Sequence, residues 1–222
     1  MNTFKKIEEL RAELLKHRLK NKKIGLVPTM GALHQGHISL VEKAREKSDV
    51  VAVSIFVNPT QFNNSEDLEK YPRNLERDLS LLHEAGCDIV FAPEVAEMYS
   101  SKHDLKINFG ALENSLEGKF RPGHFSGVGQ IVSKLFNIFQ PNSAFFGQKD
   151  LQQFFVIKKL IDQLSFPIEL HMVPTKRESN GLAMSSRNER LTEEEKIQAG
   201  LIYKTLKESA DDILNGTSIN HI

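Results

Sequence analysis

The amino-acid sequence predicts an α/β protein, built on a parallel β-sheet with helices on both faces. Residues 50–57 form a nearly continuous apolar and β-branched run, which is typical of a strand buried on both faces. An apolar segment followed by a glycine-containing turn and a helical pattern occurs twice, at residues 23–44 and at residues 143–153. Strands that alternate with helices in this way pair in parallel.

The other elements follow from local spacing, beginning at the N-terminus. Ile7, Leu10 and Leu14 recur at helical spacing and predict an amphipathic helix over about Thr3 to His17. A second amphipathic pattern, residues 75–85, closes at Gly86, a residue suited to a helix C-cap. The remaining expected elements are strands at 23–27, 88–93, 143–146 and 168–173, a candidate strand at 105–109, and helices at 38–44, 127–139, from Leu151 onward and at 192–214.

Composition excludes several classes of partner. The 29 basic side chains balance 29 acidic ones, so nothing indicates a nucleic acid or an anionic membrane. The single cysteine, Cys87, cannot form an intramolecular disulfide, which fits a reducing compartment. Residues 1–23 lack the apolar core of a signal peptide. The longest apolar run is far shorter than the roughly 20 residues that span a bilayer. We therefore expect a soluble, cytoplasmic protein.

The turn at residues 27–37 has features of a phosphate-binding site. It joins a strand to a helix and contains glycine, so backbone N–H groups and the positive end of the helix converge there. His34 and His37 stand three residues apart, with Gly36 between them, which lets both imidazoles face the helix start. Two other interpretations stay open: the histidines could hold a metal ion, or they could be ordinary surface or core residues.

Other polar segments follow predicted strands or precede a predicted helix. Asn58 and Gln61 come just after a strand and can hydrogen-bond a neutral or hydroxylated ligand. Lys149 can neutralise phosphate charge, and Asp150 can cap the next helix or help to hold a metal ion. The stretch 118–126 predicts a loop able to close over an anion. The turn at Asn58 and Gln61 and the stretch 118–126 could each be an ordinary loop instead.

Four motifs resemble those of one enzyme family, in the same order along the chain. Residues 28–37 read Pro-Thr-Met-Gly-Ala-Leu-His-Gln-Gly-His, which resembles the HxGH signature of nucleotidyltransferases and, more narrowly, that of the pantothenate synthetase (pantoate–β-alanine ligase) family. Residues 56–62, 145–153 and 184–188 are similar to the family's pantoate block, its second substrate and ATP block, and its variant of the KMSKS loop. Four matches in order, joined by compatible elements, make chance a poor explanation.

The resemblance implies ATP-dependent condensation of pantoate with β-alanine through a pantoyl adenylate, releasing AMP and pyrophosphate. Such chemistry requires cations, Mg²⁺ and oriented donors rather than a covalent nucleophile. The catalytic residues it implies are His34, His37, as proton donor, and Lys149. The pantoate-binding residues are Asn58, Gln61 and Gln153. The nucleotide-binding residues are Met30, Gly31, Ala32, Leu33, His34, Gln35, Gly36, His37, Gly147, Gln148, Lys149, Asp150, Lys176, Met184, Ser185, Ser186 and Arg187.

Two departures from the family pattern affect the metal site and the C-terminus. Arg77 stands inside the family's acidic cluster, which leaves Asp78 as the candidate metal ligand. The family usually continues past the position of Ile222 with more of a small domain that covers the site. The resemblance therefore implies a Rossmann-like domain at residues 1–176, the start of a truncated C-terminal lid domain at residues 177–222, and a homodimer.

Two other functions remain as alternatives. An HxGH adenylyltransferase that acts on a phosphate group should carry cationic residues where Gln61 and Gln153 stand. A nucleotide-binding module without catalytic activity should bind ATP yet show no turnover that depends on pantoate.

Overall fold

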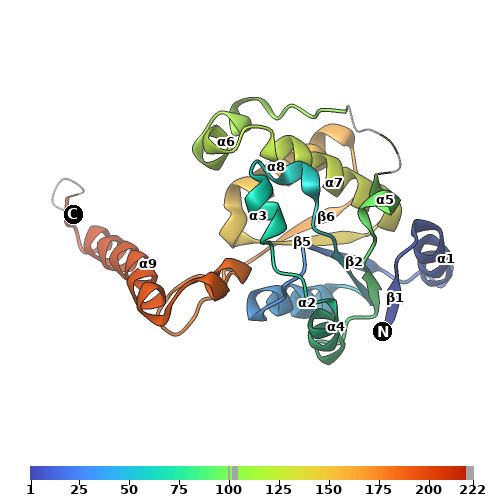
Figure 1. The fold of residues 1–222 in the computed structure, drawn as a ribbon, viewed down its shortest axis with the longest axis horizontal. Coiled ribbons are helices and arrows are strands. Elements are labelled where there is room, and N and C mark those ends of the chain that lie inside the picture. Colours follow the sequence, from blue (N-terminus) through green and yellow to red (C-terminus); the bar gives the residue numbers. More distant parts are fainter. Residues whose placement is uncertain (100, 102–104, 219–222) are drawn as a thin grey trace.

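The computed structural model describes residues 1–99, 101 and 105–218, and its helices flank a central parallel sheet (Figure 1). The six strands lie in the order β1-β4-β3-β2-β5-β6. Their bounds are β1 (Asn2–Phe4), β2 (Ile24–Thr29), β3 (Val50–Ile55), β4 (Ile89–Phe91), β5 (Ser143–Gly147) and β6 (Glu169–Val173). All the neighbouring strands pair in parallel, so the predicted α/β class is confirmed.

Helices cover both faces of this sheet. On one face α2 (Gln35–Lys47) and α4 (Leu75–Glu84) bury their apolar side chains against the strands. On the other face α1 (Ile7–Arg18), α7 (His124–Phe139) and α8 (Leu151–Leu164) enclose the larger core. Figure 1 shows α7 and α8 above the sheet, with α2 and α4 below it. The shorter helices are α3 (Ser65–Glu69), α5 (Val95–Met98) and α6 (Leu116–Phe120), and one-turn 3₁₀ helices span Pro59–Gln61, Gly110–Glu113, Gln148–Asp150 and Ser186–Arg190.

The strand order places a topological switch point between β2 and β5. The chain runs outward from β2 through β3 to β4, then returns to start β5 on the other side of β2. In open parallel sheets, ligands bind outside the carboxyl ends of the strands at such a point. The turn that follows β2 ends at His34, His37 lies in the first turn of α2, and the turn that follows β5 contains Lys149. The fold therefore brings the two predicted phosphate-binding turns together.

Pro28 ends the pairing between these two central strands. Within β2, Ile24 accepts a hydrogen bond from Asn142 on the β5 side, and Thr29 accepts one from Phe56 on the β3 side. The backbone polar groups of successive strand residues point to opposite neighbours, so those of residue 28, like those of Ile24, face β5. Proline has no N–H to donate there. The pairing of β2 with β5 reaches only Leu26. Beyond that residue the strands part, and a cavity opens between them.

The N-terminal prediction is wrong in part. Thr3 belongs to edge strand β1, which pairs with β4, and the first helix begins only at Ile7. Three residues are too few to show a strand period, so pairing with a distant partner decides their conformation.

Two predictions for the middle of the chain are also wrong. Residues 105–109 form no strand, and the Ile107 N–H is satisfied by the Ser126 hydroxyl at 3.1 Å instead of by a ladder partner. The stretch 118–126 is mostly helical, because α6 ends at Phe120 and α7 begins at His124. α7 also approaches the turn after β3 so closely that a Cβ at Gly127 would lie 2.3 Å from the Thr60 carbonyl oxygen.

The last helix, α9 (Glu193–Leu214), projects away from the body of the protein (Figure 1). Its first turn is closed by the Thr192 side chain, which accepts from the Glu195 N–H. The Arg177 guanidinium lies 3.7 Å from the centre of the Tyr203 ring and joins α9 to the segment after β6. The domain boundary at residue 176 stays a prediction. In the described part of the chain, none of the helices combines the length and the hydrophobicity that a membrane-spanning segment needs.

Candidate active site

One cavity at the carboxyl ends of β2, β3 and β5 collects all four motif segments. The residues predicted for the site that line this cavity are Met30, His34, Gly36, His37, Asn58, Gln61, Gly147, Lys149, Asp150, Gln153, Lys176, Met184, Ser185, Ser186 and Arg187. Its apolar lining includes Phe56, directly after β3, Phe146 of β5, and Val128, Ile131 and Val132 of α7. A polar mouth above an apolar wall suits a ligand with charged and hydrocarbon parts.

Several predicted residues lie outside the cavity lining. Leu33 is only 1% exposed and packs in the core beneath α2, so any contact with a nucleotide would be through its backbone, and its place in the nucleotide site stays a prediction. Ala32 is also buried, and Gln35 is exposed at the start of α2. The remaining predicted residues outside the lining are Gly31, Gln148 and Asp78.

Asp78 anchors the histidine-containing turn. Its side chain is 2% exposed; Oδ2 accepts from the Ala32 N–H at 2.9 Å and Oδ1 accepts from the Leu33 N–H at 2.7 Å. Burial raises the pKa of Asp78, and these two N–H groups counteract the shift. Both carboxylate oxygens are therefore occupied by backbone donors. This geometry supports positioning of the turn by Asp78, while its role as a metal ligand stays a prediction.

The two histidines present N–H donors to the cavity. His34 Nδ1 accepts from the Gly36 N–H at 3.1 Å, and His37 Nδ1 accepts from the His34 N–H at 3.3 Å. An Nδ1 atom that accepts cannot carry the proton of a neutral imidazole, so that proton lies on Nε2. Gly36 permits the arrangement, because a Cβ there would lie 2.8 Å from the His34 ring. Both rings line the cavity, with centres 4.1 Å apart.

Both imidazoles are neutral at physiological pH. Burial, followed by the positive charge of Lys149, lowers the pKa of His34 to about 4. Burial lowers the pKa of His37 to about 3, and the neighbouring charges of His34 and Lys149 act in the same direction. Neutral rings with Nε2–H groups can donate hydrogen bonds to phosphate oxygens without an added proton.

These low pKa values predict an acid-sensitive fold. Each unfolded imidazole takes up a proton near pH 6.5, whereas folded His34 and His37 stay neutral until about pH 4 and pH 3. Between these values the unfolded state binds more protons, so the free energy of unfolding should fall by about 1 kcal/mol or more per ring from pH 7 to pH 5. Proton NMR of the ring hydrogens should show neither ring titrating above pH 5. Titration of either ring near pH 6.5 in the folded protein would contradict this geometry.

Asn58 fixes the orientation of Gln61. Asn58 is 1% exposed; its Nδ2 donates to Gln61 Oε1 and to the Gly127 carbonyl, both at 3.2 Å. Its Oδ1 accepts from Tyr99 Oη at 2.6 Å. The Gln61 Nε2 group donates to Met30 Sδ at 2.8 Å, and Gln153 lines the same cavity.

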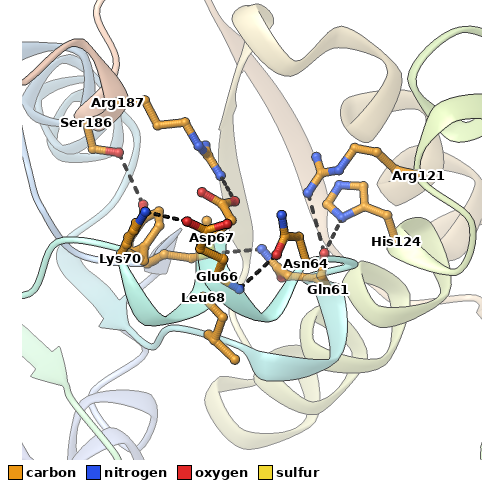
Figure 2. Close-up of polar contacts among 12 residues, drawn as sticks. Gln61, Asn64, Glu66, Asp67, Leu68, Lys70, Arg121, His124, Ser186 and Arg187 are labelled. Carbon is orange, nitrogen blue, oxygen red and sulfur yellow. Dashed lines mark hydrogen bonds and ion pairs between the residues drawn. The ribbon is translucent and has the colours of Figure 1, made fainter. Parts of the chain in front are cut away.

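Sequence reasoning missed three polar residues near Gln61. The main-chain carbonyl oxygen of Gln61 accepts from His124 Nδ1 at 2.7 Å and from Arg121 Nη2 at 3.5 Å (Figure 2). Arg121 also pairs with Glu117, and all three side chains line the cavity. The basic, glycine-containing stretch at 118–126 was the signal for them, but only the turn between α6 and α7 reveals which side chains point inward.

The segment after β6 supplies the opposite rim of the cavity. The Ser185 side chain accepts from the Arg187 N–H and starts a 3₁₀ turn. Ser186 Oγ lies 3.3 Å from Tyr71 Oη. Arg187 pairs with Asp67 at 2.8 Å, as Figure 2 shows. With Lys149 and Lys176, Arg187 adds positive charge around the mouth of the cavity.

A pre-formed divalent metal site is absent from the described part of the chain: residues 1–99, 101 and 105–218 contain no group of three or more His, Cys, Asp and Glu side chains able to hold a metal ion. Asp150 is the carboxylate among the predicted site residues that lines the cavity. It occupies the N-cap position of α8 but makes no capping hydrogen bond with its side chain. Its carboxylate can therefore contribute a ligand to a metal ion that arrives with phosphates.

The comparisons with known proteins agree on one family. The model of the family described as pantoate-beta-alanine ligase matches residues 2–222. A pantothenate synthetase of Thermoanaerobacter sp. (strain X514) is 56% identical over 211 residues, 95% of this chain and 75% of that protein. One from Aquifex aeolicus (strain VF5) is 54% identical over 202 residues, 91% of this chain and 72% of that protein.

Solved structures give the same result. The pantothenate synthetase from Thermus thermophilus has a TM-score of 0.93 and 44% identity, and the match covers all of this chain (100%) and 79% of that one. The pantoate-beta-alanine ligase from Francisella tularensis, complexed with beta-gamma ATP and beta-alanine, has a TM-score of 0.89 and 43% identity, over 93% of this chain and 79% of that one.

Proposed function

Because the chain belongs to the pantoate-beta-alanine ligase family, we infer that it joins pantoate to β-alanine at the expense of ATP, as a pantothenate synthetase of coenzyme A biosynthesis. ATP is the second substrate, and the products are pantothenate, AMP and pyrophosphate. The observation that carries the assignment is the single cavity in which the histidine turn, the two glutamine amides and the arginine-containing turn meet.

In the first step a pantoate carboxylate oxygen attacks the α-phosphorus of ATP, and pyrophosphate leaves. The Nε2–H groups of His34 and His37 donate to phosphate oxygens, where negative charge develops. Lys149 supplies positive charge beside them, and Ser185, Ser186 and Arg187 bind the phosphates from the opposite rim. In the ligand-free protein burial lowers the pKa of His37 to about 3, so the neutral ring can donate a hydrogen bond through Nε2–H, and its role as proton donor stays a prediction.

The remaining predicted residues bind the substrates. Gln61 and Gln153 hydrogen-bond the pantoate hydroxyls and carboxylate, while Asn58 acts through Gln61. The backbone of Gly147, Met184 and Lys176 contacts the nucleotide. Neutral amides at the acceptor site favour a carboxylate substrate with hydroxyl groups over a mononucleotide, which argues against the alternative adenylyltransferases.

Mg²⁺ enters with ATP, held mainly by phosphate oxygens. Bound there, the ion would supply positive charge to the transferring phosphoryl group. Asp150 is the carboxylate best placed to help hold it. The homodimer remains a prediction from the family resemblance.

In the second step the β-alanine ammonium group first loses a proton to solvent, and the free amine then attacks the acyl carbon of the adenylate. The C–O bond to AMP breaks, AMP leaves, and the nitrogen releases a second proton as the amide bond forms. β-Alanine is a zwitterion, and the Glu117–Arg121 pair beside Gln61 has the complementary charges. Arg121 would bind the β-alanine carboxylate, and Glu117 would attract the ammonium group. The apolar wall of α7 keeps water from the adenylate.

Arg121→Gln should raise the KM for β-alanine about tenfold or more, because a charge-assisted hydrogen bond to the substrate carboxylate is lost. Adenylate formation, measured without β-alanine, should stay unchanged. Lys119→Gln, which removes a positive charge from α6 away from the cavity lining, is the matched control. An unchanged β-alanine KM in Arg121→Gln would place the β-alanine site elsewhere.

An isotope experiment tests the reaction itself. Pantoate labelled with ¹⁸O in its carboxylate, mixed with ATP and β-alanine, should yield AMP that carries one ¹⁸O atom, because the attacking oxygen stays on phosphorus. Formation of ADP, or of unlabelled AMP, would rule out the adenylate route. ATP binding without product formation would favour a nucleotide-binding module that lacks catalytic activity.

A further inference from the structure

The carboxylate of Asp67, in α3, binds two arginines of the turn that forms one rim of the active-site cavity. Its Oδ2 accepts from Arg187 Nη2 at 2.8 Å, and its Oδ1 accepts from Arg190 Nη1 at 3.2 Å. Asp67 and Arg187 lie 120 positions apart in the sequence, so the contact joins two segments that only the fold brings together. Figure 2 shows the Arg187 side chain directed toward Asp67.

Other contacts hold the same turn against the segment after α3. Tyr71 Oη lies 3.3 Å from Ser186 Oγ, and Arg190 Nη2 donates to the Lys70 carbonyl at 3.0 Å. The Arg187 guanidinium also lies 5.7 Å from the centre of the Tyr71 ring. Arg187 is therefore held from two sides, by a carboxylate and by an aromatic ring.

This arrangement leaves Arg187 able to bind a second anion. A guanidinium carries five N–H donors in a fixed plane, and the hydrogen bond to Asp67 uses one of those on Nη2. A free arginine side chain loses much rotational freedom when it binds phosphate, whereas one that is already held loses less. The hydrogen bond from Arg187 lowers the pKa of Asp67, so the carboxylate is charged at neutral pH.

We propose that Asp67 is a positioning residue for ATP, which holds the Arg187 guanidinium at the cavity wall in the orientation that receives the triphosphate. Asp67 does not line the cavity and acts through Arg187. The inference rests on the proposed contact between Arg187 and the ATP phosphates. Because the Asp67 and Arg187 side chains are 27% and 43% exposed, solvent screens their interaction and the expected effect is moderate.

Titration with a non-hydrolysable ATP analogue, in the presence of Mg²⁺, tests the proposal. Asp67→Asn should raise the Kd of the analogue about fivefold and the KM for ATP by a similar factor, with the KM for pantoate unchanged. Arg187→Ala should raise the same Kd at least as much, and adding Asp67→Asn to Arg187→Ala should cause no further increase. Glu66→Gln is the matched control, since this neighbouring acid of α3 pairs with Lys70 instead of the arginine turn.

Three outcomes would overturn the proposal. An unchanged Kd in Asp67→Asn would show that the carboxylate does not position Arg187. If Asp67→Asn raised the Kd of the analogue by the same factor in Arg187→Ala as in the unmodified protein, Asp67 would act by a route other than Arg187. A parallel rise in the KM for pantoate would indicate general loosening of the fold. A normal Kd in Arg187→Ala alone would instead refute the proposed contact of Arg187 with the triphosphate, which is a separate result.

Discussion

His37→Asn is expected to slow adenylate formation roughly 10²- to 10³-fold while the fold is retained. Asparagine carries an oxygen near the position of Nδ1, so it can still accept from the His34 N–H and cap α2. It has no group at the position of Nε2, and the hydrogen bond to the transferring phosphoryl group is lost. Rapid-quench measurement of AMP formed in a single turnover, with all substrates saturating, gives the rate directly.

The matched control for this substitution is His83→Ala, which removes an exposed histidine from the last turn of α4. Its rate should equal that of the unmodified protein. ATP and pantoate should also bind to His37→Asn with little change, because the lost contact strengthens only as charge develops. A single-turnover rate within threefold of normal would show that His37 does not stabilise the reacting phosphate.

Asp78→Asn should lower both stability and activity. The amide keeps one acceptor oxygen but turns an NH₂ group toward a backbone N–H, so either Ala32 or Leu33 loses its buried partner. The expected loss in free energy of unfolding is about 1–3 kcal/mol. Displacement of the turn that holds His34 and His37 should also reduce kcat at least tenfold, because small errors of position are costly in catalysis. Urea unfolding and steady-state kinetics measure the two effects.

Magnesium dependence distinguishes anchoring from metal binding at Asp78. If the carboxylate only anchors the turn, the Mg²⁺ concentration for half-maximal activity should be the same in Asp78→Asn as in the unmodified protein. A large rise in that concentration, without loss of stability, would support the metal-ligand prediction instead. Glu76→Gln is the control, because it removes an exposed carboxylate from the same helix turn.

Strands and helices with long apolar patterns could be predicted from the sequence. The strand β3 and the helix α7 were predicted closely, because each has a long apolar pattern that is typical of one kind of element. β1 could not be predicted, because three residues carry no period and the strand exists only through its pairing with β4. The wrong strand at residues 105–109 shows the converse case, where an apolar pattern reflects burial of Phe109 without any ladder partner.

The site was predictable where motifs lie in short segments next to strand ends. His34, Gln61 and Lys149 meet because parallel strands place their carboxyl ends on one edge of the sheet. The contacts of Asp78 and Asp67 could not be predicted, since they depend on how helices pack across 45 to 120 residues of chain. In the sequence, Asp78 is an acidic residue near a predicted phosphate site and therefore suggests a metal ligand. Only the structure shows that its carboxylate accepts from two backbone N–H groups.

The most direct test of the account is exchange of labelled pyrophosphate into ATP, with Mg²⁺ present and β-alanine absent. Reversible adenylation predicts exchange that requires pantoate and does not need β-alanine, because pyrophosphate can re-form ATP from the bound pantoyl adenylate. Exchange should be almost abolished in His37→Asn. Exchange that requires β-alanine, or no exchange in a protein that binds both ATP and pantoate, would contradict the proposed chemistry of this cavity.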